Sequence, residues 1–402
     1  MYEKKQAPLH SKPMNPSDLL KGYDQSNLSI GVLGGHSALD CCHGAKKEGF
    51  KTVCVARKGR EKTYKTYYGT RDKGQGITGC VDETMVVDAF EDVLRADIVK
   101  KLRSMNTIFI QNRYFWVYVS DYSKVENDFN VPIFGNRTYV KIEERDQKYN
   151  QYHLLRDAGI RTPKIFTKPE DIDRPVIVKA SEVERGFERA FFIVSSTAEY
   201  DVKGAQLERS GKISSKWRSA VIEELIVGAP VNFNFFYSPL SQELELMGTD
   251  TRRQTNLDGF LRLTSDDQSK ALQSGVPLKM IETGHIAVTI KESLIEKAFE
   301  LGEKFVAATL RLGADAPRSG QAPKMDSRGI IGPFALQGAV VAEEGKEDIV
   351  IFDVSLRIPG SPGTKFTPYS MYLHGEPMSY GERIAKEIRR AAKEGRLEEV
   401  VT

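Results

Sequence analysis

The sequence predicts a mixed α/β and α+β protein in which a parallel-sheet α/β domain precedes a larger, mostly antiparallel region. Three observations predict this architecture. A strand, a tight turn, a helix and a second strand follow one another between Ser29 and Ala56, as in a βαβ unit with parallel strands. Short apolar runs between residues 176 and 263 follow closely on one another, which favours antiparallel pairing. Apolar residues recur at the helical period from 291 to 312, which predicts a helix packed on a sheet.

Composition narrows the class of protein. The 402 residues include 58 lysines and arginines against 55 aspartates and glutamates, and the net charge of +3 argues against a nucleic-acid partner. No stretch approaches about 18 consecutive apolar residues, and the polar N-terminus has no apolar signal core, so we expect no membrane partner. The four cysteines lack the spacing of a zinc site and are too few for a disulfide scaffold. We therefore expect a soluble, cytoplasmic enzyme, whose charge still allows a local cationic pocket for phosphate.

The α/β domain is expected to begin after a polar segment, 1–28, that we interpret as a tail or a leading helix. Ser29–Leu33 is an apolar strand, and the turn Gly34-Gly35-His36-Ser37 joins it to a helix that Gly49 ends. Further elements of this domain are predicted as strands at 51–56, 84–87 and 107–110 and as an amphipathic helix at about 93–104.

The second region opens with a predicted helix from about Glu143 to Ala158, which Gly159 closes. Its strands are expected at 176–179, 191–194, 220–225, 231–237, 244–248 and 259–263. A loop rich in proline, glycine and serine at 313–329 leads to a hairpin with strands at 334–341 and 349–354. Ser379 and Glu382 form a capping box that starts the last helix.

The glycine-containing turn of the first domain is a candidate phosphate site. His36 and Ser37 stand between a strand end and a helix start, where unpaired N–H groups and the helix dipole favour anions. A plain tight turn with Ser37 as helix N-cap explains the same residues. This segment alone favours neither interpretation.

Charged residues in two apolar strands are candidates for nucleotide binding. Lys179 closes the run VIVK, either as an edge residue that reaches solvent or as a phosphate clamp. Glu223 and Glu224 lie inside an apolar strand before Leu225, where carboxylates are costly unless they have partners. A ribose and an adenine edge would supply such partners, and exposure on one sheet face is the alternative.

The last hairpin is a candidate metal site. Asp353, Ser355 and Arg357 alternate on one strand and so share a sheet face, with Gln337 on the partner strand. Oxygen ligands on adjacent strands suit Mg²⁺, which usually takes one or two protein oxygens plus nucleotide phosphates. Arg357 would then face a transferring phosphoryl group. Taken alone, the hairpin is explained better by a solvated salt-bridge pair.

Together these segments follow the order used by ATP-grasp ligases, and the chain resembles one family of them, the archaeal 5-formaminoimidazole-4-carboxamide ribonucleotide synthetases. The resemblance runs from about Ile30 to the end of the sequence. Its motifs are GGHSALDCCHGAKKEGFKTVCV at 34–55, VPIFGNR at 131–137, LLRDAGIRTPK at 154–164, PEDIDRPVIVK at 169–179, IEELIVG at 222–228, FYSPL at 236–240, NLDGFLRL at 256–263, GPFALQ at 332–337 and GEPMSYGERIAKEI at 375–388.

The resemblance implies an ATP-grasp fold behind a preceding α/β domain at 29–138, with a lid subdomain at 139–218 and the ATP-grasp core at 219–402. It implies a homo-oligomeric ligase that uses ATP and Mg²⁺, with Mn²⁺ as an alternative ion. Its small-molecule substrates would be formate and a phosphorylated imidazole nucleotide. The implied reaction formylates 5-aminoimidazole-4-carboxamide ribonucleotide through formyl phosphate during IMP biosynthesis.

The resemblance also implies roles for individual residues. The substrate-binding residues would be His36 and Ser37, at the 5′-phosphate, with Asn256 and Arg252 also on the ribonucleotide. The residues that bind ATP would be Lys179, Glu223, Glu224 and Leu225. Gln337 and Asp353 would hold magnesium, although the family usually has Glu where this chain has Asp353. Arg357 and Lys179 would be catalytic, because they neutralise charge on the transferring phosphoryl group.

Three segments depart from the family pattern, and all are expected at loops that face ligands. The lid stretch 180–189 has one glycine and three acidic residues, Glu182, Glu184 and Glu188. Residues 111–114 replace a small His-Gly-Ser turn; Tyr114 would fill ligand space and Arg113 would offer an anion contact. The stretch 358–364 contains two prolines. These changes keep two alternatives open: a paralogous carboxylate–amine ligase with another phosphorylated substrate, and a catalytically silent nucleotide-binding relative.

Overall fold

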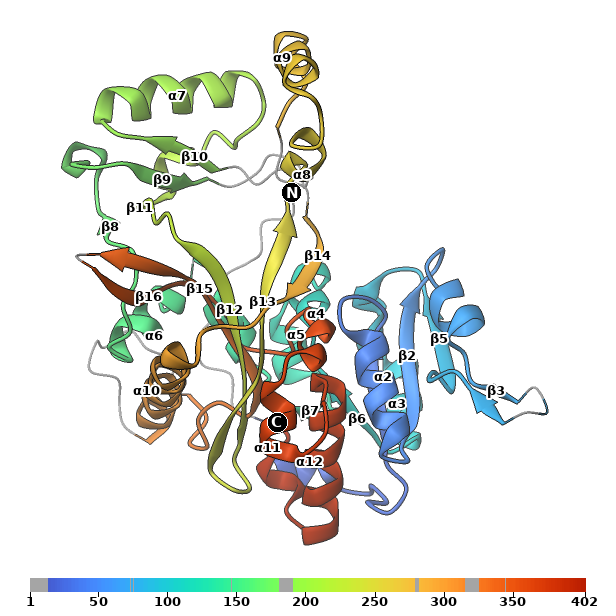
Figure 1. The fold of residues 1–402 in the computed structure, drawn as a ribbon. Coiled ribbons are helices and arrows are strands. Elements are labelled where there is room, and N and C mark those ends of the chain that lie inside the picture. Colours follow the sequence, from blue (N-terminus) through green and yellow to red (C-terminus); the bar gives the residue numbers. More distant parts are fainter. Residues whose placement is uncertain are drawn as a thin grey trace.

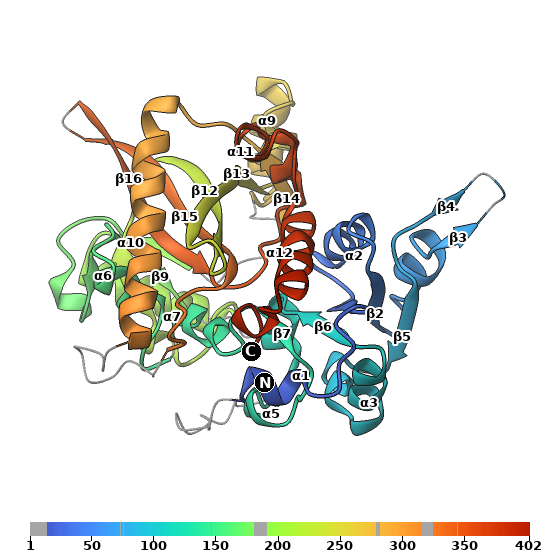
Figure 2. The ribbon, with the colours of Figure 1, turned by 90° about the horizontal axis from the view of Figure 1, so that it is seen from below.

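The computed structural model describes residues 14–402 apart from 73, 75, 146, 181–190, 279–281, 315–324 and 344. Within these residues, three sheets of four or five strands carry the fold, with a short two-stranded ribbon at one side (Figures 1 and 2). The start of the predicted tail and most of the predicted loop 313–329 lie outside the described residues. No helix in the described ranges has the length and apolar character needed to cross a bilayer.

The first sheet is parallel throughout, as predicted, with the strand order β5-β2-β1-β6-β7. All five residues of β1 are buried, because helices cover both faces of the sheet and leave no polar side. The strands are β1 (Ser29–Leu33), β2 (Lys51–Arg57), β5 (Glu83–Val87), β6 (Thr107–Ile110) and β7 (Ile133–Phe134). The helices around this sheet are α1 (Pro16–Leu20), α2 (Ala38–Lys47), α3 (Ala96–Ser104), α4 (Arg113–Tyr118) and α5 (Ser123–Asn127). The ribbon pairs β3 (Arg71–Asp72) with β4 (Ile77–Thr78).

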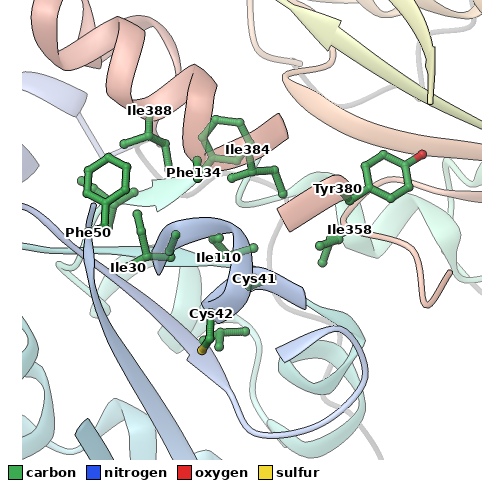
Figure 3. Packing of buried hydrophobic residues seen from close by; sticks show 14 of the residues in the cluster. Ile30, Cys41, Cys42, Phe50, Ile110, Phe134, Ile358, Tyr380, Ile384 and Ile388 are labelled. Atoms are coloured by element: carbon green, nitrogen blue, oxygen red, sulfur yellow. The ribbon is translucent and has the colours of Figure 1, made fainter. Parts of the chain in front are cut away.

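The parallel sheet packs on the C-terminal helix α12 (Tyr380–Glu394) through α2. The two helices touch at their glycines, since a Cβ added to Gly44 would lie 2.1 Å from the carbonyl carbon of Gly381. Around this crossing, Ile384 and Ile388 join Cys41 and Cys42 in one core cluster (Figure 3). All four cysteines are buried and free, so the predicted packing role of Cys41 and Cys42 agrees with the fold.

A smaller antiparallel sheet in the order β10-β9-β11-β8 follows. Its strands are β8 (Ile165–Phe166), β9 (Val176–Lys179), β10 (Phe191–Val194) and β11 (Val221–Glu224). Helix α7 (Thr197–Arg209), which the sequence analysis missed, covers one face through Tyr200, together with Trp217 of the 3₁₀ turn η5 (Trp217–Ser219). Strand β11 therefore pairs with this sheet although it follows the boundary proposed at residue 218.

The third sheet is antiparallel in the order β14-β13-β12-β15-β16. Its strands are β12 (Ala229–Ser238), β13 (Glu243–Gln254), β14 (Glu282–Ala287), β15 (Gly332–Glu343) and β16 (Lys346–Ser355). Helix α10 (Ile295–Ala314) packs on one face, where Phe305 stacks on Phe334. On β12, alternate residues Phe233 and Phe235 face α10, so the residues between them face the other side.

Two predicted elements are wrong. Helix α6 (Gln151–Asp157) begins at residue 151 rather than 143, because the Asn150 side chain caps it and the preceding chain forms the separate 3₁₀ turn η3 (Tyr139–Glu143). The strand expected at 259–263 is absent. Residues Leu257–Phe260 form the short helix α8, and Leu261 and Leu263 are exposed, because β14 already pairs with the edge of β13.

Other predictions held. The hairpin of β15 and β16 is antiparallel as expected, and the capping box of Ser379 and Glu382 starts α12. Strand β13 runs further than predicted, to Gln254. The elements that the sequence analysis missed in this region are α9 (Ser265–Gln273), β14 and α11 (Tyr369–His374).

Candidate functional site

A cavity of about 550 Å³ lies between the four-stranded sheet and the five-stranded sheet. Apolar side chains such as Ile177, Phe191 and Leu225 line it from the smaller sheet and the segment after β11. Polar side chains line it from the larger sheet. An apolar wall opposite a polar floor is the usual construction of a small-molecule site.

The polar floor is a row of side chains that crosses all five strands of the larger sheet. Direct register pairs join its members from strand to strand, and paired residues share a face. We call this set the polar row: His285 opposite Arg252, Asp250 opposite Asn232, Asn232 opposite Gln337, and Gln337 opposite Asp353. The row lies on the face away from α10. The sheet therefore buries an apolar face against α10 and offers a polar one to the cavity.

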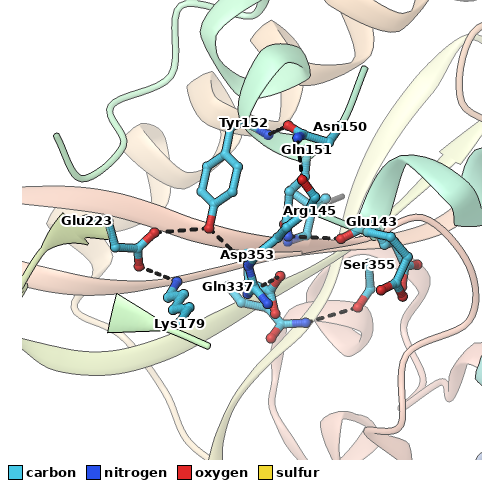
Figure 4. Close-up of polar contacts among 12 residues, drawn as sticks. Glu143, Arg145, Asn150, Gln151, Tyr152, Lys179, Glu223, Gln337, Asp353 and Ser355 are labelled. Carbon is cyan, nitrogen blue, oxygen red and sulfur yellow. Dashed lines mark hydrogen bonds and ion pairs between the residues drawn. The ribbon is translucent and has the colours of Figure 1, made fainter. Parts of the chain in front are cut away.

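At one end of the row, which we call the Lys179 end, five side chains form a continuous chain of contacts (Figure 4). Lys179 forms an ion pair with the buried carboxylate of Glu223. The hydroxyl of Tyr152 donates to Glu223 Oε2 at 3.0 Å, and Arg145 Nε donates to the Tyr152 hydroxyl at 3.0 Å. Arg145 Nη2 then lies 3.5 Å from Asp353 Oδ1. Each cation at this end has a carboxylate partner.

These contacts set the protonation states at the Lys179 end. Burial lowers the pKa of Lys179, and Glu223 opposes that effect without cancelling it. Burial alone would raise the pKa of Asp353, but Arg145, Arg252 and Lys179 together hold it below its usual range. Asp353 is therefore an ionised carboxylate beside the cavity.

The predicted metal ligands Gln337 and Asp353 lie opposite each other on β15 and β16. Gln337 Nε2 donates to Ser355 Oγ at 2.9 Å, which turns its carbonyl oxygen toward Arg252, whose Nη2 donates to it at 2.6 Å. One carboxylate and one amide oxygen fit Mg²⁺, which keeps waters or phosphate oxygens in its other positions. The described residues hold no cluster of three or more His, Cys, Asp or Glu for a metal caged by protein alone.

At the other end, which we call the His36 end, the turn after β1 faces the loop after β16. Ser37 Oγ donates to the Pro359 carbonyl at 2.6 Å, so the 2.9 Å contact with His36 Nδ1 has the ring nitrogen as donor. His36 Nε2 then carries the lone pair, and it lies against Gly360, where an added Cβ would be 3.0 Å away. Ser37 holds the N-cap position of α2, as the alternative interpretation predicted, but its side chain makes no capping hydrogen bond.

Cations surround His36. Burial lowers the pKa of its ring well below the usual range, and Arg357, His285, Arg113 and Arg252 lower it further. The Nε atoms of Arg357 and Arg252 are buried with no hydrogen-bond partner among the described residues. Buried N–H groups without partners are costly, so these two donors are candidates for contact with an anionic ligand.

Two glutamates hold the arginines of the His36 end. Glu143 Oε2 accepts from Arg113 Nη1 at 2.9 Å and pairs with Arg357 Nη2 at 3.3 Å. Glu143 Oε1 accepts from the Leu356 N–H at 2.7 Å, which ties η3 to the end of β16. Glu144 pairs with the other Nη of Arg113 at 2.8 Å. The anion contact expected of Arg113 is therefore occupied by carboxylates of the protein itself.

Three of the predicted site residues have contacts other than those expected. Glu224 lines the cavity, but its carboxylate accepts from the Lys164 N–H and from Arg174, both at 3.2 Å. Asn256 lies beyond the end of β13, where its side chain donates to the Pro277 carbonyl at 3.0 Å. Leu225 lines the cavity, but its N–H bonds to the Pro175 carbonyl.

Of the departing segments, 181–190 lies outside the described residues. Tyr114 fills space as expected: its ring packs on Gly35, whose φ is +152° and whose added Cβ would lie 2.0 Å from that ring.

Sequence reasoning missed several residues of the site, which are Glu143, Arg145, Tyr152, Asp250 and His285. One signal was present in the segment VNFNFF, where asparagines alternate with buried aromatic residues on β12. Polar side chains inside an apolar strand need partners, and these two both donate to Asp250.

Comparisons with known proteins show the family and the fold. Two family models match: a protein of unknown function, DUF1246, over residues 30–166, and a domain of unknown function, DUF1297, over residues 199–402. The chain is similar to 5-formaminoimidazole-4-carboxamide-1-(beta)-D-ribofuranosyl 5′-monophosphate synthetase from Methanothermobacter thermautotrophicus, with 38% identity over 96% of this chain and 97% of that one. The corresponding synthetase from Methanocaldococcus jannaschii is 36% identical over 96% and 98%.

Solved structures give the same picture. The crystal structure of the IMP biosynthesis protein PurP from Thermococcus kodakaraensis matches with a TM-score of 0.64 and 26% identity, over 93% of this chain and 100% of that one. An N5-carboxyaminoimidazole ribonucleotide synthetase in complex with ADP matches with a TM-score of 0.53 and 12% identity, over 88% and 78%. The second likeness shows a shared fold alone.

Proposed function

This chain belongs to the family of 5-formaminoimidazole-4-carboxamide ribonucleotide synthetases, which are ATP-grasp ligases of IMP biosynthesis, and on that premise we propose the following reaction for it. The enzyme joins formate to the amine of 5-aminoimidazole-4-carboxamide ribonucleotide at the expense of ATP, through formyl phosphate. One observation carries the proposal, which is that the polar row joins two unlike ends. At the Lys179 end, paired charges lie beside a cavity with an apolar wall. At the His36 end, Arg252 and Arg357 have buried Nε donors without a partner among the described residues.

We assign the Lys179 end to ATP. The apolar side chains Ile177, Phe191 and Leu225 offer a surface for the base, and Lys179 offers a cation for the phosphates. Gln337 and Asp353 would hold Mg²⁺, or Mn²⁺ as an alternative, and such an ion supplies charge neutralisation for phosphoryl transfer when it is bound. Glu223 would position Lys179, and Arg145 would position Asp353. Glu224 also lines this cavity, and the Lys164 N–H and Arg174 hold its carboxylate.

We assign the His36 end to the ribonucleotide and its 5′-phosphate. His36, Ser37, Arg252 and Arg357 surround the space where a dianion would satisfy the buried Nε donors. Asn256 remains a predicted contact of the ribonucleotide.

Catalysis at this site is mainly positioning and charge neutralisation. A formate oxygen attacks the γ-phosphorus, the bond to the β–γ bridging oxygen breaks, and Lys179 and Arg357 stabilise the charge that develops. The amine then attacks the formyl carbon, a C–N bond forms, and phosphate leaves as the C–O bond breaks.

Two further parts of the proposal concern specificity and assembly. A paralogous ligase with another phosphorylated substrate is the second candidate, because Tyr114 packs into the turn at Gly35 and Arg113 is held by Glu143 and Glu144.

We also propose that the protein is a homo-oligomer. Light scattering, which measures the mass in solution, tests this directly.

Product analysis tests the proposed reaction. Purified protein with Mg-ATP is incubated with formate, with the aminoimidazole carboxamide ribonucleotide, with both, and with neither, and ADP and nucleotide products are measured by chromatography and mass spectrometry. We expect ADP release together with a formylated nucleotide only when both substrates are present. Saturable ATP binding without that product would favour the paralogous ligase, and failure to bind ATP would contradict both.

A further inference from the structure

A buried carboxylate at the centre of the polar row anchors an imidazole. Asp250 Oδ2 accepts from Asn232 Nδ2 at 2.9 Å and lies 2.5 Å from His285 Nδ1, while Asp250 Oδ1 accepts from Asn234 Nδ2 at 2.6 Å. Burial alone would raise the pKa of Asp250, but His285 and the two asparagines lower it below its usual range. Asp250 is thus an ionised carboxylate in which both oxygens are occupied.

This anchor fixes which nitrogen of His285 is free. An ionised carboxylate only accepts hydrogen bonds, so Nδ1 of His285 carries a proton. The Ser361 hydroxyl also lies 3.2 Å from Nδ1. In the neutral ring Nε2 is therefore the nitrogen with the lone pair. A histidine held in this way by a carboxylate has the orientation of a general base.

The ring lies on the ribonucleotide side of the row. His285 is on β14, at the opposite edge of the sheet from β16 and Asp353, and it pairs directly with Arg252. The loop after β16 connects it to the phosphate-binding turn: Gly360 packs on His36, and the next residue, Ser361, contacts His285. His285 is also one of the groups that lower the pKa of His36. The two imidazoles therefore border the same space.

One anion and several cations face that space. Asp250 is the anion in contact with the His285 ring, the arginines that share the site from the surrounding elements are Arg252, Arg357 and Arg113, and His36 borders the space as a neutral ring. Arg113 and Arg357 are paired with Glu143. Asp250 stabilises the imidazolium after proton uptake, whereas the arginines favour proton release to the departing phosphate.

We propose that His285 Nε2 accepts the proton of the attacking amine, an inference that rests on the proposed function. As the amine nitrogen bonds to the formyl carbon, its proton passes to His285 and the electron pair of the broken C–O bond leaves with phosphate. The imidazolium then returns the proton to phosphate, so the products are the formamide and hydrogen phosphate. His285 acts in this second step and takes no part in phosphoryl transfer to formate.

The two steps are separable by isotope exchange. ATP labelled with ¹⁸O at the β–γ bridge scrambles the label when formyl phosphate forms reversibly with formate, without any amine. For His285→Gln we expect exchange within about twofold of wild type, while formation of the formylated nucleotide falls about 100- to 10,000-fold, the usual contribution of a general base. The KM for the ribonucleotide should change far less than kcat. Added imidazole should partly restore product formation in His285→Ala.

A matched control is His374→Gln. His374 Nε2 also contacts a buried carboxylate, Glu245 Oε2, at 3.0 Å, but it lies on α11 and outside the polar row. We expect wild-type product formation from this variant. Normal product formation by His285→Gln would overturn the proposal, and so would an equal loss of exchange and product together with no imidazole rescue. Absence of formate-dependent exchange and product in the wild type would instead overturn the proposed function, and the role of His285 with it.

Discussion

The two ends of the polar row differ in how their charges are balanced. In the chain of contacts at the Lys179 end both cations have a carboxylate partner, since Lys179 pairs with Glu223 and Arg145 with Asp353. At the His36 end, Arg357 and Arg252 keep buried Nε donors that have no hydrogen-bond partner among the described residues, and their charge helps to keep His36 neutral. The cations of the first end are thus paired within the protein, whereas the second end keeps arginine donors open to a ligand.

This difference indicates how each end would receive a charged ligand. A paired end gains little from a bare polyphosphate, because its carboxylates repel it. A divalent ion held by Asp353 and Gln337 would remove that repulsion, and Arg145 and Arg252, which contact these two side chains, would then become available to other groups. The cationic end needs no such ion, because a phosphate dianion itself satisfies the unpaired donors.

The largest effect is expected from Asp353→Asn, which removes one of the two carboxylates of the Lys179 end. We expect ATP turnover to fall at least about 100- to 1,000-fold, as when one preorganised electrostatic partner is lost. The melting temperature should change little, because Asp353 is 24% exposed, its contact with Arg145 is 3.5 Å long, and Arg145 keeps its bond to Tyr152. Asp348→Asn is the control, since Asp348 lies on the same strand in an exposed pair with Arg161. A large drop in melting temperature for Asp353→Asn would show that the residue is structural.

A smaller effect is expected from Glu143→Gln, which removes the carboxylate that holds Arg113 and Arg357 at the His36 end. Breaking a buried ion pair leaves uncompensated charge, so we expect the free energy of unfolding to fall by about 3 kcal/mol. Denaturant titration measures it, and Glu224→Gln, in a partly exposed pair with Arg174, should cost under about 1 kcal/mol. The affinity for ATP should stay the same in Glu143→Gln. A lower affinity for ATP would mean that the Lys179 end and the His36 end of the polar row are not independent.

The smallest effect concerns pH. The pKa of His36 lies well below its ordinary value in the free protein, so the ring is neutral at pH 7. A bound phosphate dianion favours the charged ring and raises this pKa, so binding takes up a proton. Affinity then weakens as pH rises between the free and bound pKa values, by at most about tenfold per unit.

Calorimetry in buffers of different ionisation enthalpy measures this proton uptake. The phosphate itself titrates near pH 6, so the comparison with His36→Asn isolates the contribution of the ring. On binding the ribonucleotide, the His36→Asn variant should take up fewer protons than the wild type at every pH in that window. Equal uptake by both proteins would mean that His36 does not meet the phosphate.

Local patterns in the sequence were sufficient for much of the fold. The apolar runs of β1, β9 and β10 and the capping box at Ser379 depend on neighbouring residues, and each was predicted at its observed position. The prediction of a helix from Glu143 was wrong because it followed the apolar pattern and overlooked Asn150, the residue that caps the helix. The strand at 259–263 failed because β14, which is distant in sequence, takes the sheet edge.

The site was predictable only in part, for a related reason. Lys179, Gln337 and Asp353 stand out as polar residues within apolar strands. Arg145 and His285 do not, because their importance depends on which strands are neighbours and in which register. His285 meets Asp250 across 35 positions of sequence, through a pairing that no local pattern fixes.

The metal dependence of binding tests the division of the polar row most directly. Calorimetry would measure the affinity of the wild-type protein for the aminoimidazole carboxamide ribonucleotide and for ATP, each with Mg²⁺ and with a chelator. We predict that the ribonucleotide binds equally well in both conditions, whereas ATP binds at least about tenfold more tightly with Mg²⁺, a difference of about 1.4 kcal/mol. A ribonucleotide that requires Mg²⁺, or ATP that binds as well without it, would contradict the division.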